Sequence, residues 1–173
     1  MDRTANLFGA TALRTVDLIA AATAGAAGRG AQAPAALAAI DREPGGTVER
    51  LRHHVGLSQP AAVRLVDRLE ADGLVAREPG RDARSIGLVL TPAGRRAVAA
   101  VRAAREAAIE RLLAPLAPAD RAALGALLEQ VLERADYAPH DDEHVCRLCD
   151  VPACRAGAGG CPVDRGAGTA PAP

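Results

Sequence analysis

The residues with the clearest chemical potential are four cysteines near the C-terminus. They follow the pattern C-x2-C-x4-C-x6-C and are Cys146, Cys149, Cys154 and Cys161, with a proline after the last. All the cysteines of the chain fall within these sixteen residues. A CxxC turn can place two thiolates on one ion, and the glycines at 157, 159 and 160 let the following loop bend back with the other two. The spacing therefore predicts a closed, tetrahedral zinc site.

Other interpretations of the cysteines stay open. An iron–sulfur cluster also uses CxxC with two further cysteines and a final Cys-Pro, which would make the protein a redox sensor. Free thiols can switch by oxidation without any metal. The segment can also be an interaction module that docks another protein. His140 and His144 lie close in sequence, and we expect them to be spare or to sit outside the ligand shell.

A thiol oxidoreductase using Cys146 and Cys149 is the enzymatic alternative. Such a motif sits at the start of a helix beside a βαβ pattern, whereas here it follows the last predicted long helix in a loop. We therefore expect no enzyme. Structural disulfides are not expected either, because the N-terminus lacks the basic region of a signal peptide and the cytosol keeps thiols reduced.

A second group of residues suits the reading of DNA. A predicted helix opens with Ser-Gln-Pro-Ala and continues with two arginines; glutamine suits adenine, arginine suits guanine or phosphate, and alanine or proline can touch a thymine methyl. Two more arginines bracket a predicted hairpin tip, where a narrow minor groove attracts arginine. The predicted DNA-contacting residues are Ser58, Gln59, Pro60, Ala61, Arg64, Arg68, Arg81 and Arg84.

The charge distribution agrees with a DNA-binding centre. All 21 basic residues are arginine, and the formal net charge of the chain is zero. Residues 1–44 are neutral, residues 45–105 carry a net charge of +5, and residues 106–173 carry −5. A basic middle between a neutral and an acidic segment is typical of a nucleic-acid-binding module on a scaffold that does not bind.

Periodicity, caps and breakers predict the elements that position these residues. Thr47, Ser58 and Thr91 are the expected N-caps, and Val63, Val66 and Leu69 are expected to form the inward stripe of the helix that starts at Ser58. From residue 139 onward no helical or strand period is visible. The predicted helices are one from about Leu7 that fades near Gly25–Gly30, then 34–42, 47–56, 58–72, 92–113 and 118–136, and the predicted strands are 74–78 and 85–90.

These elements define a mainly α fold with a small β-hairpin wing, a winged helix-turn-helix that is dimeric through its N- and C-terminal helices. The last long helix carries a broad apolar face that suits dimer packing. We expect a winged-helix and dimerisation domain over 1–138, with its DNA-binding core at about 34–94, and a metal-binding tail with a disordered end over 139–173. The apolar stretch 18–27 is too short to span a bilayer, so we expect a cytoplasmic protein that contacts no membrane.

The run from Thr47 to Leu74, TVERLRHHVGLSQPAAVRLVDRLEADGL, followed by DAR at 82–84 and LVLTPAG at 88–94, resembles the MarR family of regulators. The resemblance implies a homodimer whose first and last helices interlock and whose two winged lobes grip a palindromic operator. It implies repression relieved by a small-molecule effector or by cysteine oxidation. It also implies that Pro60 and Arg64 meet bases or backbone and that Arg84 is the minor-groove arginine of the wing. The sequence thus predicts a transcription regulator, specifically a repressor, that binds double-stranded DNA.

Overall fold

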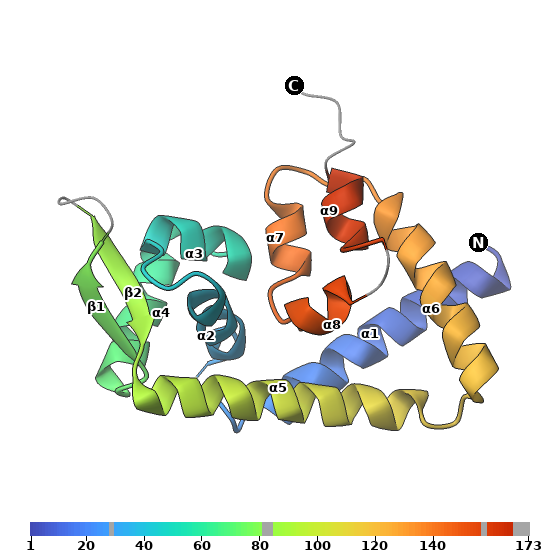
Figure 1. Ribbon diagram of the computed structural model, residues 1–173, viewed down its shortest axis with the longest axis horizontal. Coiled ribbons are helices and arrows are strands. Elements are labelled where there is room, and N and C mark those ends of the chain that lie inside the picture. Colours follow the sequence, from blue (N-terminus) through green and yellow to red (C-terminus); the bar gives the residue numbers. More distant parts are fainter. Residues whose placement is uncertain (28–29, 81–84, 157–158, 168–173) are drawn as a thin grey trace.

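The protein is described by a computed structural model over residues 1–27, 30–80, 85–156 and 159–167 (Figure 1). The predictions made for Arg81, for Arg84 and for a disordered C-terminal end lie outside these residues. Long helices frame the molecule, and a two-stranded hairpin projects at one end. In chain order the elements are α1 (Arg3–Thr23), α2 (Ala33–Arg42), α3 (Val48–Val55), α4 (Gln59–Ala71), β1 (Val75–Pro79), β2 (Ile86–Leu90), α5 (Pro92–Leu113), α6 (Pro118–Glu133), α7 (Asp141–Val145), α8 (Val151–Arg155) and α9 (Pro162–Ala167).

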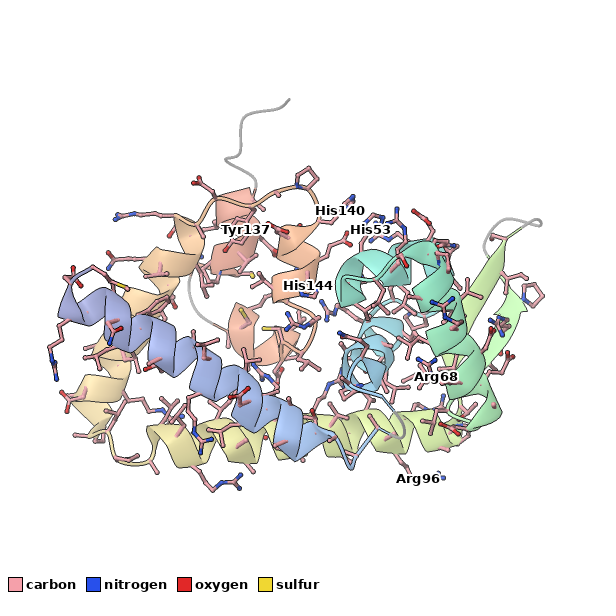
Figure 2. All side chains as sticks on the ribbon, turned by 180° about the vertical axis from the view of Figure 1, so that it is seen from behind. His53, Arg68, Arg96, Tyr137, His140 and His144 are labelled. Carbon is pink, nitrogen blue, oxygen red and sulfur yellow. The ribbon has the colours of Figure 1, made fainter. Side chains whose placement is uncertain are left out.

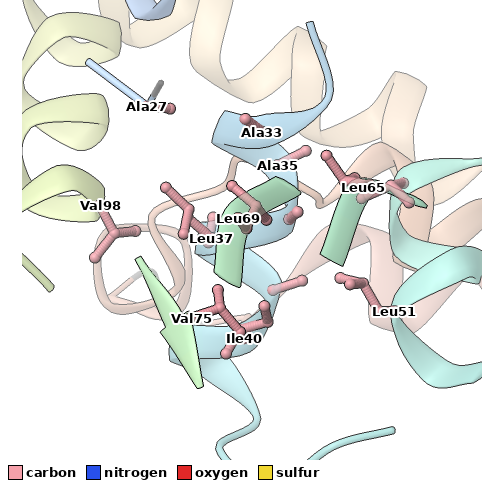
Figure 3. Packing of buried hydrophobic residues seen from close by; sticks show 14 of the residues in the cluster. Ala27, Ala33, Ala35, Leu37, Ile40, Leu51, Leu65, Leu69, Val75 and Val98 are labelled. Atoms are coloured by element: carbon pink, nitrogen blue, oxygen red, sulfur yellow. The ribbon is translucent and has the colours of Figure 1, made fainter. Parts of the chain in front are cut away.

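Helix α2 is the centre of the hydrophobic core. Every residue from 33 to 40 is buried, and most of them are alanines, whose small side chains let α3, α5 and β2 approach the helix closely. Leu37 and Ile40 provide the larger apolar contacts. Figure 3 shows Leu37 beside Leu69 of α4 and near Val98 of α5. The core therefore joins α3 and α4 to the long α5.

Helices α3 and α4 form the predicted helix-turn-helix. The hydroxyl of Thr47 accepts a hydrogen bond from Arg50 N at 3.3 Å, which confirms this N-cap. Helix α3 ends at Gly56, whose φ of +64° favours glycine, and α4 starts directly after Ser58. Ser58 occupies the N-cap position as predicted, although its side chain makes no capping hydrogen bond.

The predicted inward stripe of α4 is wrong at one position. Val63 is 37% exposed, while the buried face is made by Ala62, Leu65, Val66 and Leu69. Residues 62, 65, 66 and 69 follow the i, i+3, i+4, i+7 spacing of one helix face, and position 63 lies outside it. The predicted stripe used a spacing of three residues with Ala62 and Leu65 beside it, and a strict three-residue spacing drifts away from the 3.6-residue repeat of a helix. Val63 therefore lies on the outward face of α4, which is correspondingly less polar.

Strands β1 and β2 form the predicted antiparallel hairpin, each starting one residue later than expected. The register pairs Val75 with Leu90 and Pro79 with Ile86. Gly46 adds a bridge to Leu88 on the other side of β2, so the base of the hairpin is attached to the loop before α3. The hairpin is thereby tied to the helix-turn-helix.

Helix α5 connects the two halves of the molecule. Thr91 caps it by accepting a hydrogen bond from Gly94 N at 3.0 Å, as predicted. The helix packs along α1 and runs from the hairpin to α6 (Figure 1). Helix α6 ends at Glu133, earlier than expected, and has no buried residue. In the part of the chain that the structure describes, no helix is both long and apolar enough to cross a membrane.

The C-terminal segment contains helices where the sequence showed no period. Helices α7, α8 and α9 are only five, five and six residues long, too short to display a helical repeat. Local signals exist nevertheless: Asp150 caps α8 by accepting a hydrogen bond from Ala153 N at 3.1 Å, and Pro152 follows in the first turn. The three helices lie between α3 and α6, with α7 against α3 and α9 against α6 (Figure 1).

Candidate nucleic-acid interface and cysteine cluster

The start of α4 presents an open surface. Ser58, Gln59 and Pro60 are exposed, and Ala61 is partly buried. On the next turns of the same helix, Arg64 and Arg68 are exposed, and neither pairs with an acid of the described residues. Six of the eight residues predicted to contact DNA therefore share one helix, and the two hairpin arginines lie outside the described residues. Free guanidinium groups near a helix start are available for phosphates and base edges.

An arginine on β1 partly balances the negative charge of α4. Arg77 donates to Asp67 Oδ1 at 2.6 Å and also bonds Glu70, and the hydrogen bond to Asp67 raises the pKa of Arg77. Both acids belong to α4, so the pairing draws their charge toward the hairpin. Sequence reasoning missed this role of Arg77. Its signal was weak, because the three residues meet only when β1 folds back along α4.

Other arginines of the basic segment form hydrogen bonds or ion pairs within the protein. Arg95 donates to Leu90 O at 2.8 Å, and Arg52 pairs with Glu49 at 2.6 Å. Arg96, on the second turn of α5, is exposed and forms no ion pair among the described residues; Figure 2 labels it together with Arg68 of α4. The net charge of the segment therefore overstates the number of arginines that are free to meet DNA.

The C-terminal segment docks on the turn of the helix-turn-helix. His144 Nδ1 lies 3.1 Å from His54 O, and the ring packs so closely on Gly56 that a Cβ there would lie 2.8 Å from His144 Cε1. His53 and His140 face each other with ring centroids 3.7 Å apart (Figure 2). The side chains of His140 and His144 thus serve the α3–α7 contact, a use that the sequence did not indicate.

The same contact encloses a buried histidine and a carboxylate. His54 Nδ1 lies 3.8 Å from Glu143 Oε2, and in the described part of the chain neither atom has a hydrogen-bond partner. Burial lowers the pKa of His54, against the opposite effect of the Glu143 charge.

Nearby, Arg42 at the end of α2 donates to Cys146 O at 3.0 Å and to Arg147 O at 3.3 Å. These bonds hold the C-terminal end of α7 against α2.

The four cysteines meet in space. All of them line one cavity of about 180 Å³, together with Arg42 and residues of α8 and α9. Cysteines that follow one another in the sequence change one another's pKa, Cys146 with Cys149 and Cys149 with Cys154. All four are free thiols, and among the described residues no three His, Cys, Asp or Glu side chains already surround one point as metal ligands do.

The thiols differ in acidity. The hydrogen bond from Cys146 lowers the pKa of Cys149 to about 6. The same hydrogen bond raises the pKa of Cys146, because it stabilises the protonated donor. Burial and the negative charge of Cys149 raise the pKa of Cys154 to about 12. Cys149 is therefore more acidic than Cys146 and Cys154, and the charges of Arg105 and Arg42 also lower its pKa.

Comparison with known proteins assigns the fold. Residues 28–85 match the MarR family. A MarR-family transcriptional regulator from Silicibacter pomeroyi is 27% identical, and the match covers 79% of this chain and 92% of that one with a TM-score of 0.59. The described residues have the winged helix-turn-helix fold of MarR-family structures. Rv1404 from Mycobacterium tuberculosis is also 27% identical, over 78% of this chain and 92% of that one, with a TM-score of 0.64.

The ligand-free MarR from E. coli has the same fold, with 22% identity over 76% of this chain and 98% of that one and a TM-score of 0.63. No match was found among proteins of curated function. MarR-family proteins are transcription regulators and not enzymes. Cys146 stands at the C-terminal end of α7.

A larger cavity lies between α1, α2 and the C-terminal segment. It has a volume of about 440 Å³, and its walls come from α1, α2 and the C-terminal segment, with Arg105 of α5 and Leu132 of α6. Most of the lining is apolar, and Cys146, Cys149 and Cys154 form part of one wall. The cysteine cluster therefore borders this cavity as well.

Proposed function

We propose that the protein is a DNA-binding transcription regulator that represses from a palindromic operator as a homodimer. The observation that carries the proposal is the exposed start of α4, with Arg64 and Arg68 unpaired among the described residues and the acids of the helix held by Arg77. The major groove, about 12 Å wide, accepts one helix, and residues near the helix start reach base edges. The MarR-type fold supports this use of α4.

Removing one arginine of α4 tests the proposal. An operator selected from random duplexes should bind the protein, and Arg64→Ala should weaken binding by about 1–3 kcal/mol, roughly 5- to 150-fold in Kd. If Arg64 meets a phosphate, the slope of log K against log salt should also fall by about one. Fluorescence anisotropy over a salt series measures both. Arg111→Ala removes the same charge from the far end of α5 and should leave both values unchanged. Equal losses in the two variants would count against reading by α4.

A second copy of this chain is the partner proposed for α1 and α6. Leu127 and Val131 of α6 are 60% and 49% exposed, and Phe8 of α1 is 51% exposed. Exposed apolar faces of this size on two neighbouring helices suit an interface between copies. Leu127→Glu should convert a dimer to a monomer in sedimentation equilibrium and abolish tight operator binding. Ile86→Glu changes an equally exposed residue of the hairpin, 59% exposed, and should remain dimeric.

The proposed dimer also makes a geometric prediction. Two α4 helices that enter successive major grooves require half-sites about 34 Å apart, or one turn of DNA. Inserting five base pairs between the half-sites turns one of them to the opposite face of the duplex. Binding should then fall to the level of a single half-site, and unchanged binding to the spaced operator would contradict the two-fold arrangement.

For control of repression we propose a small apolar acid as effector. The support is the cavity of about 440 Å³, a size typical of small-ligand sites, with mostly apolar walls and two arginines, Arg105 and Arg147, in its lining. Arg147 donates to His144 O at 2.8 Å, and Arg105 forms no ion pair among the described residues. Benzoate is a suitable probe. It should raise the thermal midpoint of the wild type and release the operator, and Arg105→Gln should lose both effects while Arg111→Gln keeps them. Activation instead of release in a reporter assay would overturn the repressor assignment.

A further inference from the structure

The C-terminal segment connects two parts of the molecule that are far apart in the fold. On one side α7 lies against α3, with Arg42 and His144 making the bonds described above. On the other side α9 lies against α6, where Arg165 pairs with Glu133 at 3.2 Å. Helix α3 belongs to the DNA-reading lobe, and α6 to the proposed dimer interface. The segment therefore spans the gap between the two.

The segment has few means of holding its own shape. Isolated helices of five or six residues are unstable in water, because too few hydrogen bonds offset the cost of nucleation. Few of its residues are buried, and these are small. Within α7, α8 and α9 the buried residues are Pro162, Val163 and Gly166. A segment with so little apolar burial normally needs a covalent or metal cross-link.

The four thiols are placed to provide that cross-link. Cys146 closes α7, Cys149 follows it, Cys154 belongs to α8, and Cys161 directly precedes α9. They line one cavity of about 180 Å³, whose other lining includes Arg42, Arg155 and Asp164. Asp164 pairs with Arg155 at 3.2 Å and is therefore engaged elsewhere. The donors left for an ion are four sulfurs, a set that selects thiophilic metals over magnesium or calcium.

The donor set favours a single ion. Four thiolates form the shell of a closed tetrahedral zinc site, in which Zn–S bonds of about 2.3 Å place the sulfurs about 3.8 Å from one another. The four cysteines line one cavity, although among the described residues no three side chains yet surround one point as metal ligands do. A change of rotamer moves a cysteine sulfur by about 3 Å, which leaves the side chains free to turn toward one centre.

We propose that Cys146, Cys149, Cys154 and Cys161 bind one Zn²⁺ as a tetrathiolate, and that the ion holds the C-terminal segment as a brace between α3 and α6. Such a site carries a formal charge of −2, and the guanidinium groups of Arg42 and Arg155 at the cavity wall oppose that charge. The brace fixes how the DNA-reading lobe stands relative to α6. This consequence rests on the proposed function, since it matters for half-site spacing only if the protein binds DNA as a dimer.

Cobalt binding to the full chain tests the site without any DNA. The protein is stripped of metal by a chelator under anaerobic reducing conditions and titrated with Co²⁺ alone. We expect one equivalent to bind with the intense visible absorption and sulfur-to-metal charge-transfer bands of tetrahedral thiolate coordination, and Zn²⁺ to displace it. Each of the four Cys→Ser variants should lose those bands. Asp164→Asn, a non-sulfur change in the same cavity, should keep them.

Elemental analysis of protein purified without added metal completes this test. One zinc per chain supports the proposal. Iron with inorganic sulfide, no thiophilic metal with all thiols reactive, or full Co²⁺ spectra in Cys161→Ser would each overturn it. Because neither measurement involves DNA, failure here leaves the proposed regulator function intact, and failure of operator binding leaves the zinc site intact.

Hydrogen exchange tests the brace. With Zn²⁺ bound, amides of α3 and α7 should be protected, and removal of the ion should increase exchange in both helices by at least tenfold while amides of α2 in the core stay protected. Arg42→Gln offers a second measure, because it removes the bonds to Cys146 O and Arg147 O without touching a sulfur. It should keep the Co²⁺ spectrum and lose protection in α7. If amide exchange in α3 is the same with and without Zn²⁺, the proposal that the segment is a brace is wrong.

Discussion

The close contact between Gly56 and the ring of His144 allows the docking of the C-terminal segment on α3 to be measured. Gly56 ends α3 with φ of +64°, and a Cβ there would lie 2.8 Å from His144 Cε1 and 3.0 Å from Nδ1. Gly73 follows α4 with φ of +69°, and a Cβ there would meet nothing within 4 Å. The two glycines have the same backbone conformation, and only Gly56 contacts the segment. Replacing each by alanine therefore separates backbone strain from docking.

The expected magnitudes follow from these two terms. A left-handed alanine costs about 1–2 kcal/mol, so Gly73→Ala should lower the free energy of unfolding by that amount. Gly56→Ala should cost the same plus the displacement of His144, which loses its bond to His54 O, worth about 0.5–1.5 kcal/mol. In a His144→Ala background the new methyl meets no ring. The extra cost of Gly56→Ala should then disappear.

Urea unfolding followed by circular dichroism measures these differences, at one protein concentration because association changes the apparent stability. The docking contact is identified by an extra loss for Gly56→Ala that His144→Ala removes. If Gly56→Ala and Gly73→Ala lose equal stability in the wild-type background, α7 does not rest on the helix turn in solution, and the reasoning about the brace loses its basis.

Three further outcomes follow from the structure. Arg77→Gln should weaken operator binding at low salt, because it removes the positive charge that balances the two acids of α4 near the DNA, and anisotropy should show the loss shrinking as salt increases. The protein should lose stability as the pH falls below about 6.5, because burial, with Arg42 and Arg50 acting in the same direction, keeps the pKa of His54 lower in the folded state despite Glu143; urea midpoints at about pH 7.5 and 5.5 should differ less in His54→Gln. Leu37→Ala should cost about 2–5 kcal/mol by thermal or urea unfolding, since the side chain is fully buried, and a loss below 1 kcal/mol would contradict the placement of the core on α2.

Much of the fold could be predicted because its signals are local. Thr47 and Thr91 cap helices by bonding an amide three residues ahead, and Gly56 ends α3 in a conformation that few other residues adopt. The apolar spacing of α2 and the turn residues between the strands work over similarly short distances. The wrong prediction for Val63 shows the limit of local signals. Without the full helical periodicity, apolar residues do not define which face of a helix is buried.

Sequence signals were sufficient for α1 to α6 and the hairpin, for the arginines of α4 and for the four closely spaced thiols, but not for α7, α8 and α9. What those groups contact depends on how the chain folds. Arg77 finds its acids by chain folding between β1 and α4, and His144 and Arg42 hold the C-terminal segment through contacts separated by about ninety to one hundred residues. Such contacts depend on where α3 and α6 stand relative to each other. Capping and periodicity act within a few residues and carry no information about that distance.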